Sequence, residues 1–102
     1  MSTDPLFRMI VEDVFTIRGR GTIVTGRIEQ GSLETGNVVE LRGAGYHREV
    51  VVAAIELFRR PVERAGPGDY VGLVLEDVAG DEVERGDVLA GSKWDLSEAR
   101  EW

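Results

Sequence analysis

Apolar and polar residues alternate along this chain in short runs separated by glycine-rich turns, a pattern that predicts β-strands. The clearest run covers residues 22–29, where every second residue from Thr22 to Ile28 lies on one face. Runs rich in β-branched residues predict further strands over residues 9–17, 38–41, 47–58, 70–75 and 87–90. Many short strands with frequent turns are typical of a closed β-barrel. The residues expected inside this barrel include Val14, Val24, Ile28, Val52, Val71 and Leu73.

Glycine and proline mark the connections between these strands. Gly19 and Gly21 lie in the first turn, where we expect them to adopt positive φ. Gly26 lies inside a predicted strand, which indicates a bulge or a close approach of two backbones. Residues 59–69 hold two prolines and two glycines, so we expect them to form a loop.

Two short segments carry helix signals. Residues 81–86 predict a single helical turn, with Asp81 as its N-cap and Gly86 ending it in the left-handed region. In the C-terminal tail, residues 91–102, Asp95 and Glu98 fit a capping box. This tail is either a short helix packed on the barrel or a disordered end.

Composition narrows the possible classes of protein. A chain of 102 residues is long enough for one domain, and 42% apolar with 30% charged residues is usual for a soluble globular protein. There is no cysteine, which excludes disulfides and thiolate metal sites and suits a reducing compartment. No apolar run approaches the length of a bilayer span, and the N-terminus does not resemble a signal peptide. We therefore expect a cytoplasmic protein with no membrane partner.

The net charge of −7 argues against a protein held on nucleic acid by bulk charge. It leaves open a local contact to one nucleic-acid end. Arginine supplies nearly all the positive charge, since Lys93 is the only lysine. A GC-rich coding bias explains this more simply than selection for the bidentate grip of arginine on phosphate.

The chain lacks the motifs of common enzymes and nucleotide-binding proteins. The spacing of Gly19, Gly21 and Gly26 does not fit the dinucleotide fingerprint, and no Gly-Lys-Ser/Thr phosphate-binding sequence occurs. His47 is the only histidine and is expected on the exposed face of a strand, and no serine has a base partner readable from spacing. We predict no enzymatic activity, no cofactor, no metal and no binding of GTP.

Residues 7–89 resemble domain 2 of elongation factor Tu and related translational GTPases. Five strings carry the resemblance: EDVF at 12–15, GRGTIVTGRIE at 19–29, IELFRR at 55–60, VGLVL at 71–75 and VERGDVL at 83–89. The resemblance implies a closed six-stranded Greek-key β-barrel over residues 7–90, between an extension at 1–6 and the tail at 91–102. We expect a free-standing small protein without the GTPase domain of the family.

In that family, this domain helps to hold the aminoacylated 3′ end of tRNA, and the resemblance assigns the same contacts to matching positions here. These positions are Glu12, Asp13, Phe15, Arg20, Thr25, Glu56, Arg59 and Tyr70. The residue types fit the task, because carboxylates receive an α-amino group, an aromatic ring stacks on a base and arginine binds phosphate. The family has asparagine at the position of Tyr70, so the pocket departs from its pattern there.

Each of these residues also has a purely structural interpretation. Phe15 could belong to the core, Glu12 and Asp13 could form a solvated strand end, and the arginines could make surface ion pairs of little energetic value. Three functions therefore stay open. The chain could bind the aminoacyl end of tRNA or ribosomal RNA, dock on a GTPase domain or another translation partner, or be a structural barrel without retained RNA binding.

Overall fold

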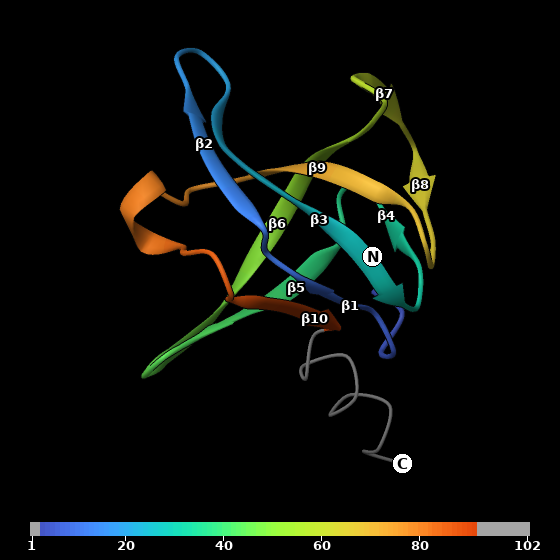
Figure 1. The fold of residues 1–102 in the computed structure, drawn as a ribbon, viewed down its shortest axis with the longest axis horizontal. Coiled ribbons are helices and arrows are strands. Elements are labelled where there is room, and N and C mark those ends of the chain that lie inside the picture. Colours follow the sequence, from blue (N-terminus) through green and yellow to red (C-terminus); the bar gives the residue numbers. More distant parts are fainter. Residues whose placement is uncertain (1–2, 92–102) are drawn as a thin grey trace.

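The computed structural model describes residues 3–91 and shows an all-β protein (Figure 1). Its strands, in chain order, are β1 (Arg8–Ile10), β2 (Asp13–Ile17), β3 (Gly21–Gln30), β4 (Leu33–Glu34), β5 (Val38–Gly43), β6 (Tyr46–Leu57), β7 (Arg60–Val62), β8 (Arg64–Ala65), β9 (Tyr70–Leu75) and β10 (Val88–Gly91). A short 3-10 turn, η1 (Gly80–Glu82), precedes β10. No helix in residues 3–91 is long and apolar enough to cross a membrane.

Six strand positions close the barrel, and all pairings around it are antiparallel. β1 pairs with β10 on one side and with β3 on the other, and the ring continues from β10 through β5, β6 and β9 to β3. β2 also pairs with β3, on the same edge as β1 but further along the strand. The β2–β3 hairpin (blue) projects from the barrel in Figure 1. Because β3 lies beside β9 rather than β5, the order is that of a Greek key. The predicted closed six-stranded barrel is confirmed.

The interior of the barrel is filled by apolar side chains. Five of the six predicted interior residues are at most 1% exposed: Val24, Ile28, Val52, Val71 and Leu73. Val14 is only half-buried and packs against the edge of the core. The reason lies in its strand, since β2 pairs with β3 alone and has no second neighbour in the sheet to cover it.

Residues 9–17 form two strands, where the sequence predicted one. The chain breaks at Val11, whose N–H donates to the carbonyl of Asp87 at 2.8 Å. The carbonyl of Val11 accepts a hydrogen bond from the N–H of Gly86, also at 2.8 Å. These two bonds tie the segment between β1 and β2 to the turn before β10, so a tertiary contact replaces the strand ladder there.

Gly26 lies at the point where β3 passes under the end of β1. A Cβ atom at this position would lie 2.3 Å from the carbonyl oxygen of Ile10 and 3.1 Å from the side chain of Met9. The close backbone approach predicted for Gly26 is therefore confirmed, and any larger residue would push the first strand away from β3.

The predicted loop over residues 59–69 contains two short strands, so that prediction was wrong in part. β7 forms a hairpin with the end of β6, and β8 pairs with β4 in a separate two-stranded sheet. Pro61 lies on β7, which pairs only with β6. An edge strand tolerates a proline because one side of the strand needs no ladder hydrogen bond. Phe58, predicted at the end of a strand, lies in the turn between β6 and β7.

The helical turn predicted over residues 81–86 is shorter and begins earlier. Asp81 lies inside η1 and does not cap it; instead the Glu82 carboxylate accepts the Ala79 N–H at 2.8 Å. Gly86 does adopt the predicted positive φ, at 92°, in the tight turn before β10. The last strand begins one residue later than predicted. The predicted tail helix lies outside the described residues.

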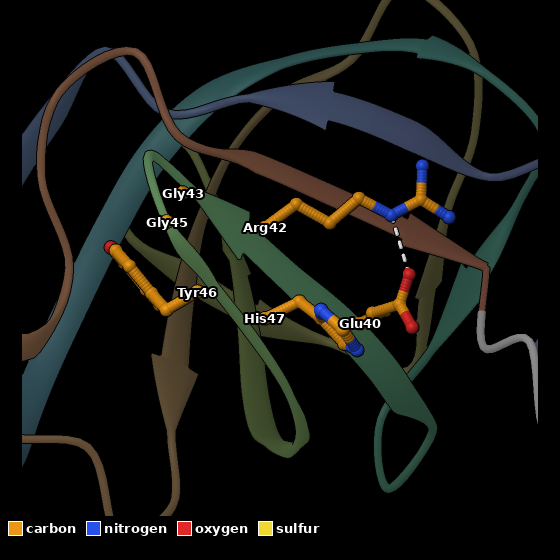
Figure 2. Close-up of a pocket in the computed structure, with 6 residues that line it drawn as sticks. All are labelled: Glu40, Arg42, Gly43, Gly45, Tyr46 and His47. Carbon is orange, nitrogen blue, oxygen red and sulfur yellow. Dashed lines mark hydrogen bonds and ion pairs between the residues drawn. The ribbon is translucent and has the colours of Figure 1, made fainter.

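Tyr46 fastens the β5–β6 hairpin to the turn before β10. Its hydroxyl donates to the Asp87 carboxylate, which also accepts the Glu84 N–H at 2.9 Å. Gly43 faces Tyr46 across the hairpin, and a Cβ there would lie within 2.4 Å of three Tyr46 ring and hydroxyl atoms. In Figure 2 the Tyr46 side chain points away from those of Arg42 and His47.

The outer side of the same hairpin carries a shallow polar hollow (Figure 2). There Arg42 forms an ion pair with Glu40, and His47 lies directly opposite Arg42 across the two strands. The solvent-facing strand position predicted for His47 is consistent with this placement, because its side chain is exposed.

We expect Gly26→Ala to lower the free energy of unfolding by about 2–3 kcal/mol, because the new methyl group overlaps the Ile10 carbonyl. Gly66→Ala is the matched control, since Gly66 has ordinary φ and no atom within 4 Å of its Cβ position. The control should change stability by less than about 0.5 kcal/mol. Urea unfolding measures both values, and equal stability of the two variants would contradict the crossing described here.

The pKa of Tyr46 is raised from 10.0 to about 12, chiefly because its hydroxyl donates to Asp87 and secondarily because it is desolvated. A raised pKa stabilises the fold below pH 10, and this contribution disappears as the pH rises toward 12. We expect Tyr46→Phe to cost about 1–2 kcal/mol at pH 7. The difference from the wild type should shrink between pH 10 and 12.

Urea unfolding across this pH range measures that difference. Tyr70→Phe is the control, because the Tyr70 hydroxyl lies at the exposed surface, and its loss should leave the stability at pH 7 nearly unchanged. A gap between wild type and Tyr46→Phe that persists unchanged above pH 12 would contradict the assignment.

Candidate functional site

An open hollow of about 650 Å³ lies where β2, β3, β9 and the β6–β7 turn meet. Seven of the eight residues assigned from the sequence line it: Asp13, Phe15, Arg20, Thr25, Glu56, Arg59 and Tyr70. The eighth, Glu12, does not line this hollow. It lines a neighbouring one together with Arg85.

Strand register brings these residues together from distant parts of the sequence. Asp13 pairs with Thr25, and Thr25 pairs with Gly72, so the three form one row across β2, β3 and β9. The next row along the same face places Phe15 beside Ile23. Gly72 has no side chain, and its nearest neighbours to a Cβ position are methyl groups at 3.7 and 4.0 Å. The middle of the hollow is therefore open because a glycine forms its floor.

Phe15 projects outward with half of its surface exposed, so it is not a core residue. Its strand pairs only with β3, so no second strand of the sheet lies beside it. The hydrophobic neighbours of Phe15 in the hollow are Ile17 and Ile23. The structure thus excludes the interpretation that Phe15 fills the barrel interior.

The β6–β7 turn adds an aromatic residue that the sequence analysis did not assign to the site. Leu57 pairs with Arg60, so Phe58 and Arg59 are the two central residues of the turn, with φ of 53° and 64°. Positive φ at both positions is the type I′ geometry, which favours Asn-Gly. Phe58 is 89% exposed and lines the hollow. In the sequence, the only signal for this turn was that these two residues separate a strand pattern from a basic run that contains proline.

The charged side chains of the hollow divide into one pair and two single groups. Arg20 forms an ion pair with Glu56. This pairing agrees with the interpretation of Arg20 as a surface ion-pair residue. Arg27, which has the same interpretation, instead donates a hydrogen bond to the carbonyl of Gly68 at 2.6 Å. Within residues 3–91, the Asp13 carboxylate and the Arg59 guanidinium have no hydrogen-bond or ion-pair partner. The hollow therefore presents one unpaired negative and one unpaired positive group to solvent.

Tyr70 closes one end of the hollow. Its hydroxyl lies 3.3 Å from Glu12 Oε1 and 3.3 Å from Thr25 Oγ1. The Arg27 guanidinium lies over its ring, 5.8 Å from the centroid. No group of three or more histidine, aspartate or glutamate residues within 3–91 is arranged to hold a metal ion.

The family whose sequence model matches this chain is described as elongation factor Tu domain 2, and the match covers residues 21–90. The chain belongs to this family. The matched region contains Thr25, Glu56, Arg59 and Tyr70, while Asp13 and the other site residues of the first hairpin precede it. In this elongation factor Tu domain 2 barrel, the pairing of β2 with β3 is what brings the preceding residues to the matched ones. The match includes no GTPase domain.

The β6–β7 turn predicts a stability effect. Phe58 in the left-handed region costs about 1–2 kcal/mol relative to a residue that tolerates it. Asparagine tolerates this region, and the Phe58 side chain is almost fully exposed, so little packing is lost. We expect Phe58→Asn to raise the free energy of unfolding by about 1 kcal/mol.

Phe58→Ala is the matched control, because alanine removes the ring without relieving the backbone strain. Thermal and urea unfolding of the two variants separate these effects. A Phe58→Asn variant no more stable than Phe58→Ala would show that the turn is not strained.

Proposed function

We propose that the hollow lined by Asp13, Phe15 and Arg59 binds the aminoacylated 3′ end of an RNA, and that the domain is a non-catalytic module of the cytoplasmic translation machinery. The observation that carries the proposal is a pair of opposite charges, without partners among residues 3–91, in one hollow beside exposed aromatic rings. An aminoacylated RNA end offers the complementary groups: an ammonium, a phosphate and a base.

Each group of that ligand has a chemically suitable residue in the hollow. The Asp13 carboxylate accepts hydrogen bonds from an α-ammonium group. The Arg59 guanidinium has the planar, multiple-donor geometry that suits a phosphate. The exposed ring of Phe15 offers a flat apolar surface on which a base stacks. Arg20 and Glu56 also line the hollow and already satisfy each other as an ion pair.

The open shape of the hollow limits the affinity. A ligand in a shallow site keeps much of its surface in water, while association still costs translational and rotational freedom. We expect a dissociation constant on the order of 0.1–1 mM for a short aminoacylated oligonucleotide. The net charge of −7 on the chain also opposes the approach of RNA and leaves the local arginines to attract it.

A second candidate function is docking of a protein such as a GTPase domain or another translation partner. Exposed Ile17 and Phe58 on the rim of the hollow favour it, because apolar rim residues are common in protein interfaces. Salt separates the two functions. Binding through phosphate weakens as salt is added, whereas binding through apolar groups changes little.

We expect Arg59→Ala to weaken the binding of an oligonucleotide that ends in CCA and carries a 3′-aminoacyl amide by about tenfold. Arg60→Ala is the matched control: Arg60 is the next residue, is also exposed and does not line the hollow. The control should retain wild-type affinity. NMR titration of the labelled protein measures weak affinities and locates the binding residues at the same time.

Both variants should retain the wild-type melting temperature within about 2 °C, since both side chains are exposed and neither has a partner among residues 3–91. Equal affinity of Arg59→Ala and Arg60→Ala would contradict the proposed site. Binding that is unaffected by salt would favour the docking function instead.

A further inference from the structure

Tyr70 is held in place at both ends of its side chain. At the outer end, the hydroxyl lies between Glu12 Oε1 and Thr25 Oγ1, 3.3 Å from each. A tyrosine hydroxyl has one proton, so it donates to one of these oxygens at a time, and the carboxylate is the stronger acceptor. The Thr25 hydroxyl is then free to donate to the tyrosine oxygen.

The ring of Tyr70 is fixed separately from its hydroxyl. Arg27 lies over the ring with its guanidinium carbon 5.8 Å from the centroid. Arg27 is itself anchored, because its guanidinium donates to the carbonyl of Gly68 at 2.6 Å. Register places Arg27 directly opposite Tyr70 on β3 and β9, so the stacking follows from the strand pairing. Tyr70 is therefore a supported wall and not a freely rotating surface side chain.

The two adjacent carboxylates of the first hairpin differ in their relation to the proposed site. Glu12 contacts the Tyr70 hydroxyl and lines the neighbouring hollow, which Asp13 and Arg85 also line. Asp13 alone of the two lines the hollow of the proposed site. Glu56 also lines the hollow but is paired with Arg20, so Asp13 is the unpaired carboxylate that an α-ammonium group meets there.

The position of Asp13 decides where the rest of an aminoacyl group must go. Asp13 is directly opposite Thr25, and the Tyr70 hydroxyl lies next to Thr25. An amino acid whose ammonium binds Asp13 therefore has its α-carbon close to Thr25, with Tyr70 bounding the space for its side chain. A large side chain would collide with a residue that is anchored by three contacts.

We propose that Tyr70 limits the size of the amino acid in this site, so that the hollow takes an RNA 3′ adenosine carrying no amino acid or one with a small side chain. This inference rests on the proposed function and names the class of ligand for the same hollow. Tyr70 acts by exclusion, since its ring occupies the volume into which a bulky side chain would extend.

The test compares two ligands that differ only in side-chain size. Both are CCA trinucleotides ending in 3′-amino-3′-deoxyadenosine, acylated through a stable amide with glycine or with phenylalanine. We expect the wild type to bind the glycyl compound about tenfold more tightly than the phenylalanyl compound. In Tyr70→Ala, the affinities for the two ligands should agree within about twofold, because the wall is removed.

Tyr70→Phe is the matched control, since it keeps the ring and the Arg27 contact and loses only the hydroxyl. We expect it to retain most of the preference for the glycyl compound. Circular dichroism and thermal unfolding confirm that each variant is folded before titration.

The outcomes separate this inference from the function on which it rests. If the wild type binds both compounds equally, or if Tyr70→Ala keeps the tenfold preference, the size limit is wrong and the binding function stands. If neither the wild type nor Tyr70→Ala binds either compound, the proposed function is wrong and the size limit is refuted with it.

Discussion

Closure of the barrel depends on the contact between the first strand and β3. β1 is the strand that pairs with both β10 and β3, and without it the sheet would be open. This contact is possible only because Gly26 lets the Ile10 carbonyl approach the backbone of β3. One missing side chain thus allows six strand positions to close around a shared core.

The same first strand also creates the candidate site. After Val11 leaves the ladder to bind the turn before β10, β2 continues along β3 beyond the closed part of the barrel. Since nothing covers the other edge of β2 in the sheet, Phe15 and Asp13 face solvent while their strand stays fixed by backbone pairing. The constraint that closes the barrel therefore also holds polar and aromatic groups outward on a rigid sheet, which is the arrangement that a binding surface requires.

Local strain is concentrated on the opposite rim of the hollow. Three non-glycine residues within 3–91 have positive φ, and two of them, Phe58 and Arg59, are the centre of the β6–β7 turn. An Asn-Gly pair would form this turn with less strain. The turn instead presents a bare aromatic ring and an unpaired guanidinium to the hollow. Strain that persists at such a position is characteristic of sites where side-chain identity matters more than stability.

The sequence by itself determined the class of fold, the main strands, the close approach at Gly26 and the family resemblance that residues 21–90 share with elongation factor Tu domain 2. These features are local, because alternation of side chains and the backbone freedom of glycine are properties of neighbouring residues. The tertiary structure decided the break at Val11, the strand pairing of β7 and β8, and the cap on η1. The break at Val11 and the pairing of β8 with β4 depend on partners far away in the sequence. The β7 hairpin and the cap on η1 are local contacts whose geometry only the structure shows.

The features of the candidate site can be divided in the same way between sequence and tertiary structure. Residue types and the resemblance indicated which side chains to examine, yet the pairing of Arg20 with Glu56 and the isolation of Asp13 and Arg59 follow only from how β2, β3, β6 and β9 align. Tyr70 likewise contacts Glu12 and Thr25, which precede it in the sequence by 58 and 45 positions. Sequence fixes which groups are available, and strand register fixes which of them meet, because a shift of one residue would turn each side chain to the other face of the sheet.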